Sequence, residues 1–101
     1  MASPNRVAII TGAAAGIGRA IALRLAQDGF DLGLFDLPSA KGALEEIAES
    51  VKAAHGTRTV LVFGDVSQEA DVERLVTTVV GELGSLYAVR AVAAAGVKVI
   101  C

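Results

Sequence analysis

The sequence has one cysteine, no run of basic residues and no long apolar stretch, and each scarcity argues against a class of protein. A single cysteine, Cys101, cannot form an internal disulfide, so the composition predicts a reducing, cytoplasmic environment. Lysine and arginine number 9 against 11 aspartates and glutamates and lie scattered, which argues against a nucleic-acid partner. No stretch approaches the roughly 20 apolar residues of a membrane span, and no histidine or cysteine cluster indicates a metal site.

What the sequence has in excess is apolar residues, at 53% before its 11 glycines are counted. An ordinary domain has about 45–50% with glycine included. Strands of a parallel sheet that is buried on both faces would account for the excess, as would a piece of a larger protein. The length of 101 residues fits one domain and leaves no room for two.

Short apolar runs alternate with segments of helical periodicity. The runs predict strands over residues 6–11, 31–36 and 59–63, and a fourth strand over 86–94. Apolar residues recur at three- and four-residue steps in the three intervening segments, and Ser67 is expected to cap the third helix. Because crossovers between parallel strands are right-handed, this pattern predicts an α/β fold: a doubly wound, Rossmann-type parallel sheet with strands in the order 3-2-1-4.

A glycine-rich turn follows the first predicted strand and contains Gly12, Gly16 and Gly18. Gly12 would allow the sharp turn, Gly16 the close approach of a ligand to the main chain, and Gly18 close packing of helix on strand. The amides of the first helical turn would then point at the pyrophosphate of a dinucleotide. A glycine-rich helix start without a ligand is the plainer alternative.

Asp36 ends the second predicted strand, 18 residues after Gly18. An acidic residue about 20 residues after the glycines binds the ribose hydroxyls of NAD, although a simple turn-forming aspartate is the alternative. A carboxylate would repel the 2′-phosphate of NADP, and neither neighbouring position, Ala15 or Leu37, is basic. NAD is therefore the predicted cofactor and NADP the less favoured one.

Residues Thr11 to Gly18, Thr-Gly-x-x-x-Gly-x-Gly, resemble the glycine motif of short-chain dehydrogenases/reductases. The segment Gly64-Asp65-Val66-Ser67 after the third strand is similar to the adenine-pocket turn of that family. The resemblance implies that Asp65 bonds the adenine amino group and that the Val66 amide bonds a ring nitrogen. It also implies that the Ile17 amide lies near the phosphates and that Thr11 braces the turn.

The resemblance extends to about residues 86–89, and we expect residues 90–101 to depart from it. Residues 92–96 read Val-Ala-Ala-Ala-Gly where the family has an Asn-Asn-Ala-Gly pattern. The catalytic serine and Tyr-x-x-x-Lys pair implied by the family are absent, because the only tyrosine, Tyr87, is followed four residues later by Ala91. No catalytic residue is predicted, and residues 1–101 are expected to be a partial, truncated NAD-binding domain.

Two functional hypotheses follow. The first is an NAD(P)-dependent oxidoreductase that acts on a carbonyl or alcohol, of which this chain carries the dinucleotide-binding half. The second is a noncatalytic nucleotide-binding fragment or module. Another user of the doubly wound fold, such as a methyltransferase, fits less well, because Thr11 and the Gly64-Asp65-Val66 turn resemble the dehydrogenase family. Either way, an apolar fourth strand at the sheet edge would invite self-association.

Overall fold

The structure is a computed structural model that describes residues 6–83 and 97–100. Four parallel strands form one sheet among these residues, in the order β3-β2-β1-β4. This confirms the predicted fold class and strand order. The elements are β1 (Val7–Thr11), α1 (Gly16–Gln27), β2 (Asp31–Asp36), a 3₁₀ turn (Pro38–Ala40), α2 (Lys41–His55), β3 (Thr59–Phe63), α3 (Glu69–Leu83) and β4 (Val97–Ile100).

The predicted fourth strand over residues 86–94 lies outside the described residues. The fourth strand of the structure is β4, which pairs with β1 in the register Val7↔Val97 to Ile10↔Ile100. It lies at one end of the strand order, so self-association through that edge stays a prediction.

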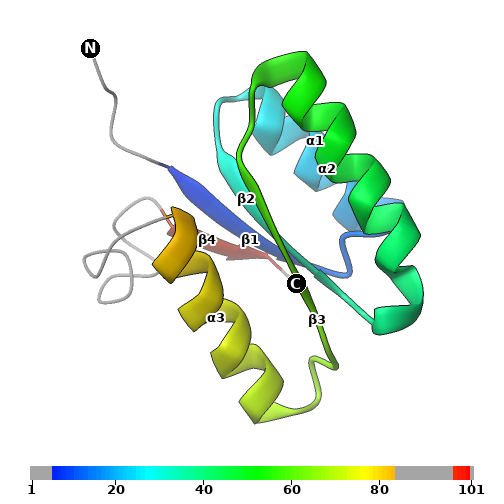
Figure 1. Cartoon of the computed structure of the whole chain (residues 1–101), viewed down its shortest axis with the longest axis vertical. Helices are drawn as coiled ribbons and strands as arrows, with labels where there is room; N and C mark the ends of the chain where they lie inside the picture. The colour runs from blue at the N-terminus through cyan, green and yellow to red at the C-terminus, as the bar shows by residue number, and fades with distance from the viewer. Residues whose placement is uncertain (1–5, 84–96, 101) are drawn as a thin grey trace.

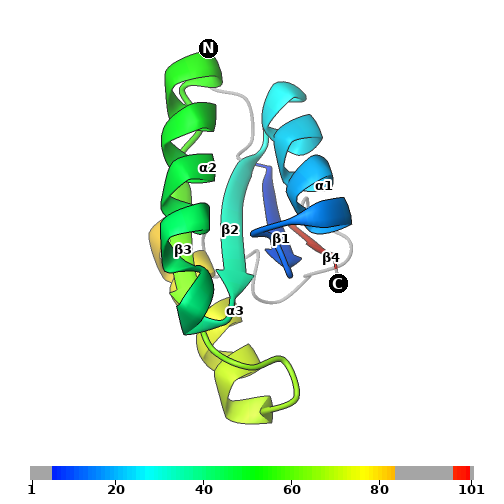
Figure 2. The same ribbon diagram turned by 90° about the vertical axis from the view of Figure 1, so that its right-hand side faces the viewer.

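Helices cover both faces of the sheet. Figures 1 and 2 show α1 and α2 on one face and α3 on the other. The chain moves in one direction across the sheet from β1 to β3 and then returns past β1 to β4. Because each crossover is right-handed, the helices before β3 and the helix after it must lie on opposite faces.

Strand β1 supplies side chains to both layers. Val7 and Ile9 belong to the apolar cluster beneath α3, whereas Ala8 and Ile10 belong to the cluster beneath α1 and α2. All four are at most 1% exposed. Because alternate residues of a strand point to opposite faces, a strand buried on both faces must be apolar throughout.

Gly33, in the middle of β2, lets α3 approach the sheet closely. A Cβ atom built on Gly33 would lie 2.9 Å from Cγ1 of Val79 and still closer to its Cγ2. Val79 is completely buried, so it has no free space into which to move.

We therefore expect Gly33→Ala to lower the free energy of unfolding by about 1–3 kcal/mol through overpacking. Urea denaturation measures this change. Gly42→Ala is the matched control, because a Cβ on Gly42 in α2 meets nothing within 4 Å. The double variant Gly33→Ala/Val79→Ala should recover part of the loss, and equal stability of Gly33→Ala and the unaltered chain would contradict the packing argument.

Candidate functional site

The predicted site residues lie in the turns that follow three neighbouring strands. Strands β1, β2 and β3 are parallel and end at Thr11, Asp36 and Phe63. Their carboxyl ends therefore share one edge of the sheet, where ligands of open α/β sheets bind. Hydrogen bonds tie the three turns together at this edge, and each is described below.

The glycine turn between β1 and α1 has the conformation that its glycines allow. Gly12 and Gly16 have φ values of +66° and +59°, which side chains disfavour, and a Cβ on either would meet nothing within 4 Å. A Cβ on Gly18 would instead clash with the Gly12 carbonyl oxygen and lie 2.8 Å from its carbon. Gly18 thus permits the helix to pack on the turn, whereas open space lies beside Gly12 and Gly16.

The N-terminus of α1 lacks the usual internal partners for its amides. Its N-cap residue, Ala15, provides no side-chain hydrogen bond, and no acidic residue lies in the first turn. Helix α3, in contrast, has Glu69 and Asp71 in its first turn. The first amides of a helix need acceptors and carry partial positive charge, so this end of α1 suits an anion.

Asp36 connects the end of β2 to the glycine turn. Its Oδ2 accepts a hydrogen bond from the Ala14 amide at 3.0 Å, and its Oδ1 accepts one from the Leu37 amide at 2.7 Å. The neighbouring Ala13 amide donates to the Phe35 carbonyl at 3.2 Å. The carboxylate predicted to bind ribose therefore also fixes the turn predicted to bind pyrophosphate.

Asp65 forms a tight local turn with Ser67. Its Oδ1 accepts hydrogen bonds from both the amide and the hydroxyl of Ser67, each at 2.8 Å. Both bonds hold the pKa of the Asp65 carboxyl below its ordinary value, and the bond from the Ser67 amide has the larger effect. The prediction that Ser67 caps α3 is wrong: its hydroxyl is bonded to Asp65, and the helix begins at Glu69.

Three large apolar side chains are exposed at this edge. Ile17 is 80%, Val66 57% and Leu37 50% exposed, and they are the exposed large hydrophobic residues of the described part of the chain. Ile17 lies at the start of α1, which follows the glycine turn, whereas Leu37 and Val66 lie in the turns after β2 and β3. Exposed apolar groups gathered beside backbone donors are typical of a binding site.

Sequence reasoning did not find Leu37, Asp71 or Arg74 as site residues. Leu37 follows Asp36 directly, and its exposure is a tertiary property. Asp71 and Arg74 lie in α3 and contact the turn after β3, with Asp71 accepting a hydrogen bond from the Asp65 amide at 2.9 Å.

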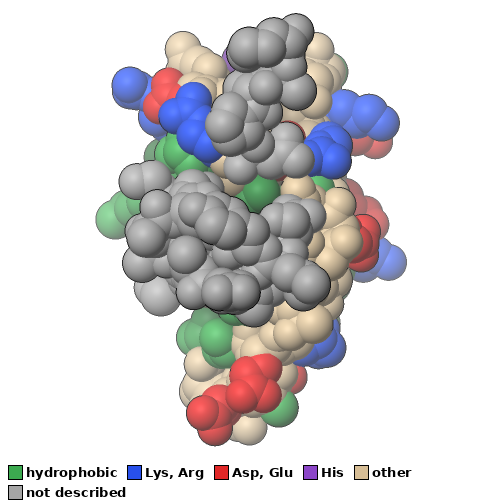
Figure 3. Space-filling model, turned by 90° about the vertical axis from the view of Figure 1, so that its left-hand side faces the viewer, with side chains coloured by type: hydrophobic (Ala, Val, Ile, Leu, Met, Phe, Trp, Pro, Cys, Tyr) green, Lys and Arg blue, Asp and Glu red, His purple; other side chains and the backbone are tan. Residues whose placement is uncertain are grey.

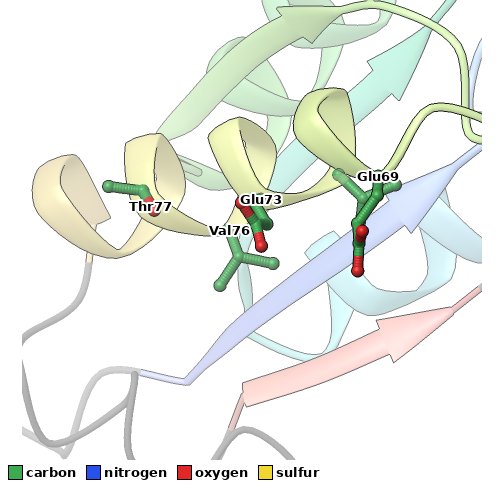
Figure 4. A pocket seen from close by; sticks show the side chains of 5 residues that line it. Glu69, Glu73, Val76 and Thr77 are labelled. Atoms are coloured by element: carbon green, nitrogen blue, oxygen red, sulfur yellow. The ribbon is translucent and has the colours of Figure 1, made fainter.

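A second concave region lies on α3 and is separate from these turns. Figure 3 shows the molecule from this side. The hollow has a volume of about 460 Å³, and Figure 4 shows the side chains that project from α3 and line it. None of the predicted cofactor-binding residues lines it. Its lining residues are Glu69, Val72, Glu73, Val76 and Thr77.

Other classes of site have no support in the described residues. Within residues 6–83 and 97–100, no group of three or more histidine, cysteine, aspartate or glutamate side chains could hold a metal ion. No helix in that same part of the chain is long and apolar enough to cross a bilayer. Tyr87 and Cys101 lie outside the described residues.

Comparison with known families matches the chain to the short chain dehydrogenase family over residues 6–100. This range includes residues 90–100, where we expected a departure from the family pattern. Among curated proteins, a short-chain dehydrogenase/reductase of Armillaria gallica is 50% identical over 84 residues. One of Hericium erinaceus is 51% identical over 86 residues. Both alignments cover 83% of this chain, which spans 32% and 34% of the respective relatives.

Solved structures agree with the sequence relatives. L-sorbose reductase from Gluconobacter frateurii, in complex with NADPH and L-sorbose, has a TM-score of 0.72 at 34% identity. A short-chain dehydrogenase/reductase from Burkholderia phymatum, in complex with NAD, has a TM-score of 0.72 at 36% identity. Each alignment covers 81% of this chain and 30% or 28% of the other. The two neighbours thus hold different dinucleotides.

The Asp36 contacts predict a measurable effect on the glycine turn without any ligand. Asp36→Ala removes the acceptor of the Ala14 amide, so that amide should exchange its hydrogen faster, and the free energy of unfolding should fall by about 1 kcal/mol. Asp28→Ala is the control, because it removes the same charge but only an exposed ion pair with Arg24. Unchanged exchange at Ala14 would contradict the role of Asp36.

The Asp65–Ser67 bonds predict a pH effect. Because the pKa of Asp65 is lowered in the folded chain, its stabilising contribution is present above the ordinary carboxyl pKa and is lost as pH falls through the lowered one. Ser67→Ala should raise the pKa of Asp65 part of the way to its ordinary value, since the amide bond remains. An NMR titration of the carboxyl carbon measures this, with the exposed Ser50→Ala as control. An unchanged pKa in Ser67→Ala would rule out the hydroxyl's contribution.

Proposed function

The chain belongs to the short-chain dehydrogenase/reductase family, and from this premise we propose that it is the dinucleotide-binding part of an NAD(P)-dependent oxidoreductase that acts on a carbonyl or alcohol. The alignments span only about a third of the length of these relatives. The proposal therefore assigns cofactor binding to these residues, and the activity to a complete family member.

The observation that carries the proposal is the convergence of three turns that offer what a dinucleotide needs. Open space beside Gly12 and Gly16 and the uncapped start of α1 suit the pyrophosphate. The exposed side chains of Ile17, Leu37 and Val66 suit the flat apolar faces of the bases and sugars. The residues of this edge thus fit the cofactor in both charge and polarity.

Each predicted residue has a distinct part in this proposal. Gly12, Gly16 and Gly18 shape the pyrophosphate turn, which Thr11 braces at the end of β1. The Ile17 amide donates to the phosphates from the first turn of α1. Asp36 accepts from the ribose hydroxyls with lone pairs that its bonds to Ala14 and Leu37 leave open, since an ionised carboxylate has about four acceptor positions.

The adenine would lie at the turn after β3. Asp65 Oδ1 is occupied by Ser67, so its other oxygen would accept from the adenine amino group. The Val66 amide makes no hydrogen bond with another residue of the described ranges and is able to donate to a ring nitrogen. These two roles are proposed together, because they place a donor and an acceptor side by side.

NAD is the cofactor that we propose over NADP. A 2′-phosphate beside the carboxylate of Asp36 would meet like charge. The neighbouring residues Ala15 and Leu37 are both apolar, so neither supplies a cation to offset this repulsion. Neighbouring structures include both NAD and NADPH complexes, so the choice depends on the residues of this chain.

When bound, the nicotinamide cofactor supplies the hydride donor or acceptor. Proton transfer to the substrate oxygen needs a second group, which the family provides through Tyr-x-x-x-Lys. This sequence has Tyr87 and Ala91 at that spacing and no such pair. The 101 residues by themselves are therefore proposed to bind cofactor without turnover.

Calorimetric titration with NAD, NADP and S-adenosylmethionine tests the proposal. The unaltered chain should bind NAD at least about tenfold more tightly than NADP, which corresponds to about 1.4 kcal/mol. The double variant Asp36→Ala/Leu37→Arg should reverse this preference, because it exchanges a carboxylate for a guanidinium. Asp28→Ala, which changes the same charge far from the glycine turn in sequence, should leave the preference unchanged.

Each other outcome has a definite meaning. Equal binding of NAD and NADP would refute the part assigned to Asp36 but not the dinucleotide site. Binding of S-adenosylmethionine alone would assign the site to another user of this fold. Absence of binding to all three ligands would refute the proposed function of this chain.

A further inference from the structure

Two charged side chains of α3 hold the turn that follows β3. Asp71 Oδ2 accepts a hydrogen bond from the Asp65 amide at 2.9 Å. Arg74 Nη2 donates to the Phe63 carbonyl at 2.7 Å and lies 3.5 Å from Asp71 Oδ1. The Asp71–Arg74 pair, as we call it, thereby joins the first turns of α3 to the end of β3.

The turn over residues 64–68 presents one unbonded amide among bonded ones. The Val66 amide makes no hydrogen bond with another residue of the ranges 6–83 and 97–100. Its neighbours are fixed, so the direction of this donor is set by their bonds. The bonded amides are those of Gly64 to the Asp36 carbonyl (3.1 Å), Asp65 to Asp71 Oδ2 (2.9 Å), Ser67 to Asp65 Oδ1 (2.8 Å) and Gln68 to the Asp65 carbonyl (2.9 Å).

Gly64 shows how closely the Asp71–Arg74 pair packs on the backbone. A Cβ on Gly64 would lie 2.8 Å from Asp71 Oδ2 and 3.1 Å from Arg74 Nη2. Glycine at this position therefore lets the carboxylate reach the Asp65 amide. The Asp71 side chain is 30% exposed and that of Arg74 51% exposed, so the pair's direct Coulomb attraction is screened and its hydrogen bonds to the backbone matter more.

We propose that Asp71 and Arg74 are positioning residues for adenine recognition, a proposal that rests on the function proposed above. Neither residue is assigned a contact with the ligand. They act by holding Asp65 and Val66 in the conformation that offers an acceptor and a donor to the base. A preorganised turn binds more tightly, because its ordering cost is met during folding rather than on binding.

The test is the affinity for ADP, measured by calorimetry on the 101-residue chain. Asp71→Leu removes the acceptor of the Asp65 amide and should weaken ADP binding about two- to tenfold, the range expected for one hydrogen bond. Asp71→Asn keeps an acceptor oxygen and should restore most of the affinity. Glu73→Leu removes a charge from an exposed position of the same helix and should leave the affinity unchanged.

Stability and amide exchange separate positioning from general support of the fold. A merely structural role of Asp71 would lower the urea midpoint of Asp71→Leu and leave the ADP affinity of the folded chain unchanged, which would overturn the inference. Should Asp71→Leu fail to fold, Arg74→Ala offers a second variant, with weaker ADP binding expected and equal binding overturning the proposal. In the ligand-free chain, the Asp65 amide should exchange more slowly than that of Val66, and the reverse would also overturn it.

Binding of ADP and NAD by the unaltered chain separates the role of Asp71 and Arg74 from the proposed function. If it binds ADP and the variants bind equally well, only the part of Asp71 and Arg74 is refuted. If the unaltered chain binds NAD but not ADP, this inference fails and the proposed function stands. If it binds neither, both fail.

Discussion

Burial of β1 on both faces is the constraint on which the other features depend. Its residues Val7 to Ile10 are almost completely inaccessible, with alternate side chains in the two apolar clusters. Pairing with β2 on one side and β4 on the other fixes the strand in the middle of the described sheet. Because the strand cannot shift, the turn that follows it at Thr11 has a fixed starting point, and α1 begins at a defined place at the sheet edge.

Hydrogen bonds then hold the turns after β2 and β3 in place relative to the turn after β1. The Ala14 amide in the first turn is bonded to Asp36 at the end of β2, and the Asp36 carbonyl accepts from Gly64 after β3. Asp36 therefore links all three turns through one side chain and one carbonyl. Ligand-facing groups that are fixed in this way by the scaffold need little rearrangement on binding.

Four glycines shape the backbone at this edge, for two different reasons. Gly12 and Gly16 adopt positive φ, whereas Gly18 and Gly64 are needed because neighbouring atoms lie too close for a Cβ. The site is thus built from backbone groups held at close quarters, which suits an anionic ligand approached by amide donors.

The sequence by itself determined the alternation of strands and helices, the Rossmann-type order and the glycine turn. Each of these depends on local periodicity or on the conformations that glycine allows, both of which are visible along the chain. The tertiary structure decided what the sequence does not encode locally: β4 at Val97–Ile100, the Ser67 bond to Asp65 instead of a helix cap, and the contacts of Asp71. Strand pairing and side-chain-to-backbone bonds depend on which elements meet in space, and packing around the buried β1 settles this.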